Sequence, residues 1–203
     1  WEDKVIYTDP VGSVELYASY PKADIVLITD IHGDHFNPET IAGVSKDSTT
    51  VIVPQAVFDL LKAKPNKVTG ILVVNNGGKV GPPNFAGEIE AIPMYNLPEA
   101  TSTPHTKGRG NGYVVEKDGF RVYIAGDTEG IPEMRALKDI DIALIPMNLP
   151  YTMSVEDAAD AVLAFKPKQV WPYHYRGPDG LSDVNLFKTL VNTGNKDIEV
   201  VLG

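Results

Sequence analysis

Residues 24–35 of this chain are Asp24-Ile25-Val26-Leu27-Ile28-Thr29-Asp30-Ile31-His32-Gly33-Asp34-His35. The apolar run at 25–28 is typical of a β-strand buried on both faces. Directly after it come four side chains of metal-binding type: Asp30, His32, Asp34 and His35. Proteins of the α/β class often hold ligands beyond the carboxyl ends of their strands, and burying a carboxylate without a partner is costly. A bound cation would supply that partner, so the segment predicts a metal site suited to zinc, iron or manganese.

The alternative is a polar turn whose side chains only cap a helix that starts at Asn37. The positions of the other candidate ligands argue against it. The chain has four histidines, and the two outside this segment are His105, in a long loop, and His174, after a predicted strand at 169–173. Asp127 follows another predicted strand, 121–125. Since every candidate lies at a strand end or in a loop, the pattern favours a shared metal site.

Composition limits the class of protein. With 203 residues and 43% hydrophobic residues, we expect one globular domain spanning 1–203. The net charge of -9 argues against a nucleic-acid partner. The absence of cysteine excludes disulfides and thiol catalysis, and no apolar run reaches the roughly 20 residues of a membrane span.

The chain starts at Trp1 and not at Met, from which we expect that a tag, signal peptide or longer leader was removed. Location in the cytoplasm and export both stay open, and so does the oligomeric state.

The expected elements begin with β-rich segments and end with alternating strands and helices. A hairpin of 4–7 and 14–20 is expected around Asp9-Pro10 and Gly12, and Lys117-Asp118-Gly119 is a second hairpin turn. The other expected strands are 24–29, 51–53, 71–74, 88–94, 112–116, 121–125, 140–145, 169–173 and 198–202. The expected helices are a short one opened by Asn37-Pro38-Glu39, then 55–62, 154–165 with Ser154 as its cap, and 184–191. This order predicts an α/β fold with two sheets and helices outside. The loop 96–112 is long enough to predict a functional role.

These residues resemble the metallo-β-lactamase superfamily, which places a His-x-His-x-Asp-His motif after a strand, then a further His, a bridging Asp and a last His. The resemblance covers nearly the whole chain and implies a four-layer αββα sandwich with two mixed β-sheets. The branch that it resembles most is that of single-domain hydrolases such as L-ascorbate-6-phosphate lactonase. The segments that carry this likeness are 124–128, 146–148, 151–153 and 172–175.

The resemblance also implies a ligand set, from which the chain departs twice. Asp30 stands where the superfamily has His. A carboxylate there favours iron or manganese more than an all-imidazole site would, and we expect it to weaken the metal site to which Asp30 belongs. The middle histidine is His105, later in the chain than in many relatives, with Asn96 as the alternative through a water. The implied sites are Asp34, His35, Asp127 and His174 for the firmer one, and Asp30, His32, His105 and Asp127 for the other, with one or two divalent ions.

By this resemblance the chain is a metal-dependent hydrolase that uses a metal-bound hydroxide, with zinc as the expected ion and manganese or iron as alternatives. Asp34 would be the catalytic residue that orients the hydroxide and takes up a proton. Arg109 and Arg176 lie close to His105 and His174 in sequence, and they predict a local site for an anion. The resemblance implies that the substrate is a small molecule, a lactone or a phosphoester. Each arginine could instead hold a loop by bonding carbonyls or an acid. The alternative functions are a metal-binding module that has lost part of the dinuclear site and, with less support, a nuclease.

Overall fold

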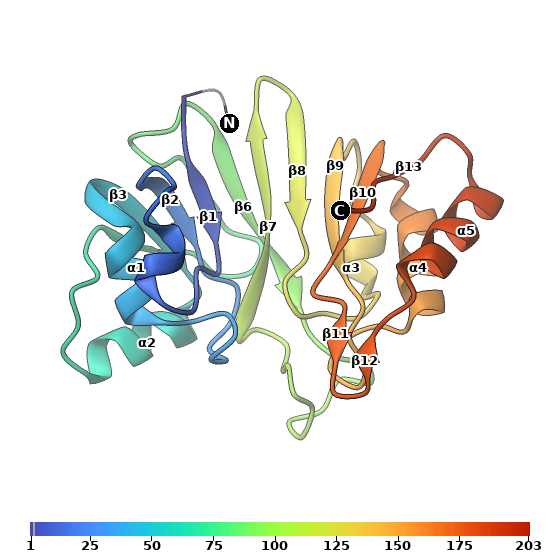
Figure 1. Ribbon diagram of the computed structural model, residues 1–203, viewed down its shortest axis with the longest axis horizontal. Coiled ribbons are helices and arrows are strands. Elements are labelled where there is room, and N and C mark those ends of the chain that lie inside the picture. Colours follow the sequence, from blue (N-terminus) through green and yellow to red (C-terminus); the bar gives the residue numbers. More distant parts are fainter. Residues whose placement is uncertain (2) are drawn as a thin grey trace.

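The protein is described from a computed structural model, which covers Trp1 and residues 3–203. Its elements form four layers, with two β-sheets face to face in the middle and helices on both outer sides (Figure 1). This is the αββα arrangement expected from the resemblance.

The first sheet comes from the N-terminal third of the chain. Its strands β1 (Ile6–Thr8), β2 (Ala23–Leu27), β3 (Ser45–Val53) and β4 (Ile71–Val73) are parallel and lie in chain order. All five residues of β2 are buried, as the apolar run predicts. Helices α1 (Pro38–Val44) and α2 (Gln55–Ala63) cover the outer face. Asn37 caps α1 by accepting bonds from the backbone N–H groups of Glu39 and Thr40, and Pro38 takes the first turn, as predicted.

The hairpin expected at the start of the chain is wrong. β1 pairs in parallel with β2, with Ile6 opposite Ile25, and Val14–Tyr17 forms the short 3-10 helix η1. Ser13 caps η1, and the turn at Asp9 has a positive φ of 47°. The carboxylate of Asp9 accepts the backbone N–H of Thr29, so this turn is held by the segment after β2 and does not lead into a second strand.

The second sheet contains seven strands in the order β13-β10-β9-β8-β7-β6-β5. Neighbouring strands from β5 through β8 are antiparallel to each other. Neighbouring strands from β8 through β9 and β10 to β13 are parallel. The strands are β5 (Lys79–Val80), β6 (Glu88–Met94), β7 (Gly110–Lys117), β8 (Phe120–Ile124), β9 (Ile142–Pro146), β10 (Gln169–Tyr173) and β13 (Glu199–Val200). The hairpin turn predicted at 117–119 is confirmed, because Asp118 and Gly119 have positive φ angles of 53° and 79° between β7 and β8.

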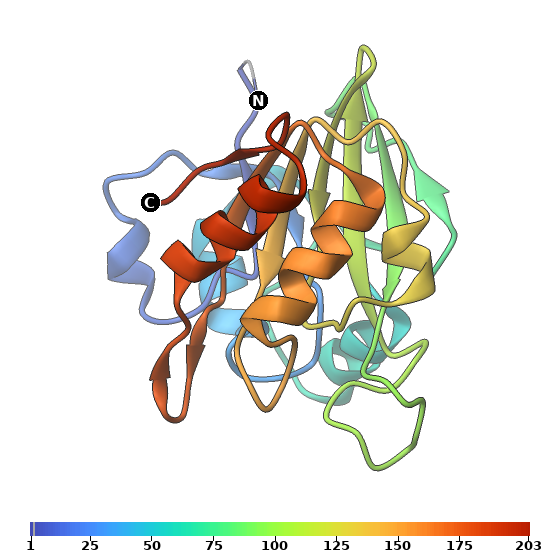
Figure 2. The ribbon, with the colours of Figure 1, turned by 90° about the vertical axis from the view of Figure 1, so that its right-hand side faces the viewer.

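Helices α4 (Val155–Phe165) and α5 (Val184–Gly194) lie across the outer face of this sheet, beside the short α3 (Pro132–Arg135) (Figure 2). Ser154 caps α4 by accepting the N–H of Asp157, which confirms the predicted cap. The hairpin of β11 (Arg176–Gly177) and β12 (Gly180–Leu181) follows β10. Within the described part of the chain, no helix is long and apolar enough to cross a bilayer.

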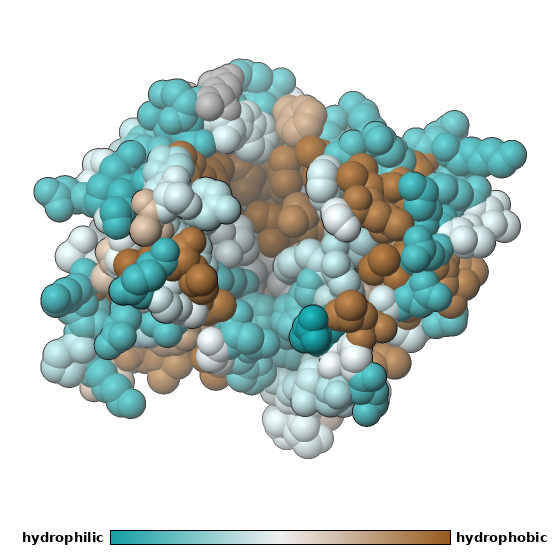
Figure 3. Space-filling model, viewed as in Figure 1, coloured by the Kyte–Doolittle hydropathy of each residue, from teal (hydrophilic) through white to brown (hydrophobic). Residues whose placement is uncertain are grey.

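The core between the sheets is formed by apolar side chains of both. Ile25, Leu27 and Ile52 of the first sheet pack with Ile89 and Tyr113 of the second, among others. Figure 3 shows apolar residues recessed along the middle of one face, while hydrophilic residues cover much of its outer parts. The loop 95–109 and the β11–β12 hairpin extend from the same edge of the molecule, the lower edge in Figure 1.

Candidate metal centre

His35 is fixed by the segment that precedes it. The side chain is 2% exposed, and its Nδ1 lies 2.8 Å from Asp9 Oδ2 and 3.0 Å from Thr29 Oγ1. With Nδ1 occupied in this way, Nε2 is the ring nitrogen left for other partners. It lies 3.3 Å from Asp127 Oδ2 and 3.7 Å from Asp34 Oδ2.

Asp127 is placed by a tight turn after β8. Gly126 has a φ of 67°, and a Cβ there would lie 2.7 Å from Met94 Sδ, so the turn requires glycine. The Gly126 N–H donates to the hydroxyl oxygen of Tyr173 on β10, at 2.9 Å. This bond ties the turn to the neighbouring part of the sheet, and Asp127 itself is 3% exposed.

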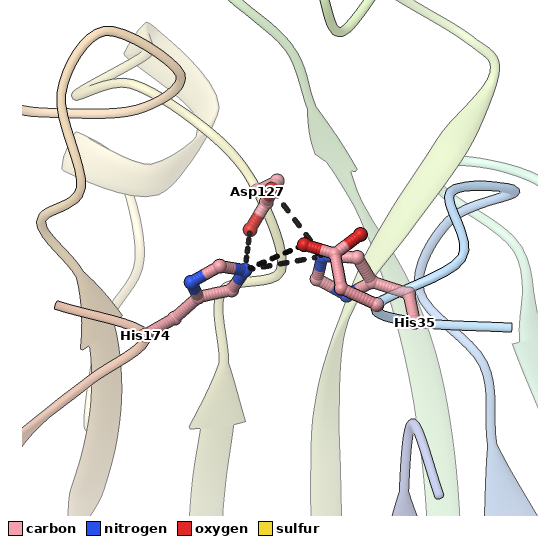
Figure 4. Close-up of side chains that lie close together, drawn as sticks. His35, Asp127 and His174 are labelled. Carbon is pink, nitrogen blue, oxygen red and sulfur yellow. Dashed lines mark hydrogen bonds and ion pairs between the residues drawn. The ribbon is translucent and has the colours of Figure 1, made fainter. Parts of the chain in front are cut away.

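His174 completes the first group of ligands. It follows β10 with a positive φ of 45°, a conformation uncommon for residues other than glycine. Its Nε2 lies 3.4 Å from Asp127 Oδ1, 3.4 Å from Asp34 Oδ2 and 3.3 Å from His35 Nε2. Figure 4 shows His35, Asp127 and His174 converging from three separate segments. Asp34, His35, Asp127 and His174 each offer one atom that could bind a metal ion, and these four atoms all lie within 4.8 Å of one another.

A second group contains Asp30, His32 and His105, whose ligand atoms also lie within 4.8 Å of one another. His32 Nδ1 is 2.9 Å from Asp30 Oδ2. His105 Nε2 lies 3.9 Å from the same oxygen and 3.2 Å from Asp127 Oδ2. Asp127 therefore lies between the two groups, in the position expected of a bridging ligand.

Asn96 and His105 have different positions in this group. His105 is 1% exposed and its Nε2 faces Asp127. Asn96 Oδ1 lies behind it, where it accepts the His105 backbone N–H at 2.8 Å and contacts Nδ1 at 3.1 Å. The sequence left His105 and Asn96 open as the middle ligand. In the structure His105 directs its ring nitrogen Nε2 toward Asp127, and Asn96 orients the His105 ring through Nδ1.

The two arginines expected near the site differ in their partners. Arg109 donates from Nε and Nη2 to the two oxygens of Asp30, at 3.0 and 2.8 Å, and from Nη2 to the Pro104 carbonyl at 2.7 Å. This is the alternative in which the arginine holds an acid and a loop. Arg176 is exposed on β11, and within the described residues no hydrogen bond or ion pair engages its guanidinium.

The electrostatics of the first group suit a cation. Burial alone would lower the pKa of His35, but Asp127 and Asp9 outweigh it and raise the pKa to about 11. Burial alone would raise the pKa of Asp127, but His105 and His35 hold that pKa well below its usual range. Among the residues that the structure describes, His105 Nε2 and Asp127 Oδ1 are buried without a hydrogen-bond partner. Buried polar atoms without partners are rare, and a cation bound at the first group would supply a partner for Asp127 Oδ1, so the residues of this group fit a metal ion.

Asp9 is the functional residue that sequence reasoning missed. Asp9-Pro10 was interpreted as a hairpin turn, whereas the carboxylate of Asp9 orients His35 across 26 residues. The available signal was an acidic residue directly after a short strand, at the same kind of position as Asp30 and Asp127.

Comparison with known proteins places this centre in a family. Residues 1–174 match the family described as the beta-lactamase superfamily domain. The chain belongs to this superfamily. Among its relatives is a UPF0173 metal-dependent hydrolase of Pyrococcus furiosus, 32% identical over 209 residues that cover 98% of this chain and 89% of the relative. A UPF0173 metal-dependent hydrolase of Staphylococcus saprophyticus is 31% identical over 96% of this chain and 89% of its own. The chain therefore belongs to the UPF0173 metal-dependent hydrolases.

Solved structures support the same fold. A protein of Parabacteroides distasonis named as a metal-dependent hydrolase has a TM-score of 0.81 and 42% identity, over 97% of this chain and 83% of its own. The metallo-β-lactamase fold protein YhfI of Bacillus subtilis has a TM-score of 0.68 over 93% of this chain and 78% of its own; at 12% identity it shows the fold alone. The predicted superfamily and fold class are thus confirmed, while the resemblance to L-ascorbate-6-phosphate lactonase stays a prediction.

Proposed function

We propose that the protein hydrolyses a small anionic substrate with a divalent metal ion held by Asp34, His35, Asp127 and His174. The observation that carries this proposal is the convergence of these four side chains, although His35 and His174 are 139 residues apart in the chain. Two imidazoles and two carboxylates form a donor set suited to zinc, with manganese or iron as alternatives.

A bound divalent ion would lower the pKa of water to about 7 and so supply a hydroxide nucleophile at neutral pH. The residues of the chain would then position the reactants. Asp127 and His35 are both buried. The tight turn at Gly126 fixes the position of Asp127, and Asp9 orients the His35 ring through Nδ1. The Asp34 side chain is 60% exposed, so solvent reaches a carboxylate that faces His174. This placement supports Asp34 as the group that orients the nucleophile and takes up a proton.

The preference for an anion is supported by Arg176. Its guanidinium follows His174 by two residues, is exposed, and has no partner among the described residues. In a chain of net charge -9, an exposed arginine two residues after the candidate ligand His174 can attract a carboxylate or phosphate group. A lactone or a phosphoester fits these groups, and the acidic surface weighs against a nuclease.

The test combines metal content with turnover. The protein is purified without chelator, its metals are measured by elemental analysis, and hydrolysis is followed on a panel of charged and neutral lactones and phosphoesters. His174→Ala and Asp127→Asn should lose metal and activity together, whereas Asp197→Asn, at an exposed position on the last turn of the chain, should keep both.

Arg176→Ala should keep its metal and lose about 1.5 to 3 kcal/mol in kcat/KM on anionic substrates alone. Equal losses on neutral analogues would remove Arg176 from substrate binding. Full metal occupancy without turnover on any ester would favour the non-catalytic metal-binding module.

A further inference from the structure

Asp30 already has charged partners in this structure. Its side chain is 0% exposed, and both of its oxygens accept hydrogen bonds from Arg109, in the two-pronged geometry that a guanidinium offers to a carboxylate. His32 Nδ1 lies 2.9 Å from one of these oxygens. The buried charge of Asp30 is therefore compensated by residues of the chain.

Arg109 is held in this place by the backbone around it. The next residue, Gly110, begins β7, and a Cβ there would lie 2.7 Å from the Thr29 carbonyl oxygen. The following N–H, of Asn111, donates to that same carbonyl at 2.9 Å. The start of β7 is thereby fixed beside the residue that precedes Asp30. Together with the bond to Pro104, this makes the Arg109 side chain, 19% exposed, part of the fold and not a mobile surface group.

We infer that the guanidinium of Arg109 takes the place of a second metal ion at the group of Asp30, His32 and His105, so that the protein binds one ion per chain. This inference rests on the proposed function, because it takes Asp34, His35, Asp127 and His174 as the site of that one ion. A metal ion at the second group would have to displace Arg109 from an Asp30 oxygen. It would also lie close to a permanent positive charge, since Arg109 Nη2 is 3.5 Å from His32 Nε2.

The remaining ligands of the second group would be ready if Arg109 were removed. His105 Nε2 is buried and unbonded, and it faces Asp127 at 3.2 Å. Without the guanidinium, Asp30 would be a buried carboxylate lacking its main partner, which a divalent ion could replace. Loss of the arginine should therefore increase metal content, the opposite of what removal of a ligand or of a structural residue would do.

The experiment measures metal stoichiometry, using cobalt(II) as the probe. Metal-free protein is titrated with cobalt(II), the ions per chain are counted by native mass spectrometry, and the visible absorption of bound cobalt is recorded. The wild-type chain should bind about one ion, and Arg109→Gln about two, with a second set of absorption bands. Arg109→Lys keeps the positive charge and should stay at about one. Arg121→Gln, which removes an arginine paired with Glu116 at the start of β8, the end of the strand opposite to Asp127, is the matched control and should stay at about one.

Each result has a distinct meaning. Two ions in the wild-type chain would overturn the inference and leave the proposed function standing, whereas no bound ion would contradict the proposed function itself. One ion in both wild type and Arg109→Gln would show that Arg109 does not control occupancy. If Arg109→Gln does not fold, the double variant Asp30→His with Arg109→Gln removes the unpaired buried carboxylate and should bind about two ions; one ion there would overturn the inference.

Discussion

Asp9 shows how a single residue outside the ligand set determines the geometry of the centre. Its carboxylate bonds His35 Nδ1, which leaves Nε2 facing Asp127. Residues that orient a metal-binding imidazole in this way commonly contribute a factor of about 10 to 100 in metal affinity. His105 depends in the same manner on Asn96.

Replacing Asp9 with Asn should weaken metal binding by about 10-fold to 100-fold, because the neutral amide holds His35 less strongly. Asparagine tolerates the positive φ of 47° at this position, so the fold should persist. Competition with a chromogenic chelator measures the affinity. Asp139→Asn is the control, since Asp139 is exposed and has a φ of 53°; a loss of affinity equal to that of Asp9→Asn would contradict the orienting role.

Asp141 joins two elements of the second sheet. Its side chain, 9% exposed, accepts the Arg121 N–H of β8 at 2.7 Å and the Lys168 ammonium, just before β10, at 2.7 Å. Burial alone would raise the pKa of Asp141, but these two partners outweigh burial and lower that pKa. The charged form of Asp141 therefore stabilises the end of the sheet at which the parallel strands β8, β9 and β10 begin.

Asp141→Asn should reduce the free energy of unfolding by about 1 to 2 kcal/mol at neutral pH. Because the pKa is lower in the folded state, the stability from the carboxylate is fully present above the unfolded pKa of about 3.9. It is lost as the pH falls through the folded pKa, so the two proteins should converge at acid pH. Urea titrations of metal-free protein between pH 7 and pH 3 measure this. Asp160→Asn, whose carboxylate is 72% exposed, should change stability by less than about 0.5 kcal/mol, and a pH-independent loss at Asp141 would refute the account.

At the scale of the whole molecule, the two sheets are held together by apolar packing and by a few buried polar contacts between them. The hydroxyl of Tyr113, on β7, donates to the Ile28 carbonyl just after β2 at 2.7 Å. Tyr123, on β8, is equally buried, but its hydroxyl has no hydrogen-bond partner among the described residues. The pair offers a matched comparison of the same substitution.

Tyr113→Phe should lower the free energy of unfolding by about 1 to 3 kcal/mol, because it leaves the Ile28 carbonyl without this bond between the sheets. Tyr123→Phe should be neutral or stabilising, because it removes a buried hydroxyl that has no partner. Chemical denaturation of both variants measures the difference. Equal effects would mean that the bond to Ile28 does not contribute to the association of the sheets.

The candidate metal ligands also link the two sheets. Asp34 and His35 follow β2 of the first sheet, whereas Asp127 and His174 follow β8 and β10 of the second. An ion bound only by the folded chain, at a free concentration 100 times its Kd, stabilises it by about 2.7 kcal/mol. For a chain of this size, chelation should lower Tm by about 5 to 10 °C. Differential scanning calorimetry with and without chelator tests this, and Asp127→Asn should show almost no chelator effect.

Local sequence determined much of this protein. The apolar run at 25–28 predicted a fully buried strand, and Asn37, Ser154 and Asp118-Gly119 predicted caps and a turn, because capping and tight turns depend on residues a few positions apart. Asp34, His35, Asp127 and His174 stood out as candidate ligands because they lie near predicted strand ends, and the family resemblance implied that they share one metal site. All four converge in the structure.

Only the tertiary structure decided the pairing of β1 with β2, the contact of Asp9 with His35, and the bond between Arg109 and Asp30, which joins residues 79 positions apart. β-Rich residues at 4–20 are compatible with a hairpin or with a parallel strand and a turn of helix, because strand propensity does not specify the partner. In the same way, an arginine near a histidine in sequence is equally suited to a substrate anion or to a buried carboxylate. The folded backbone settles this by placing the start of β7 beside Thr29, where Asp30 is within reach of Arg109.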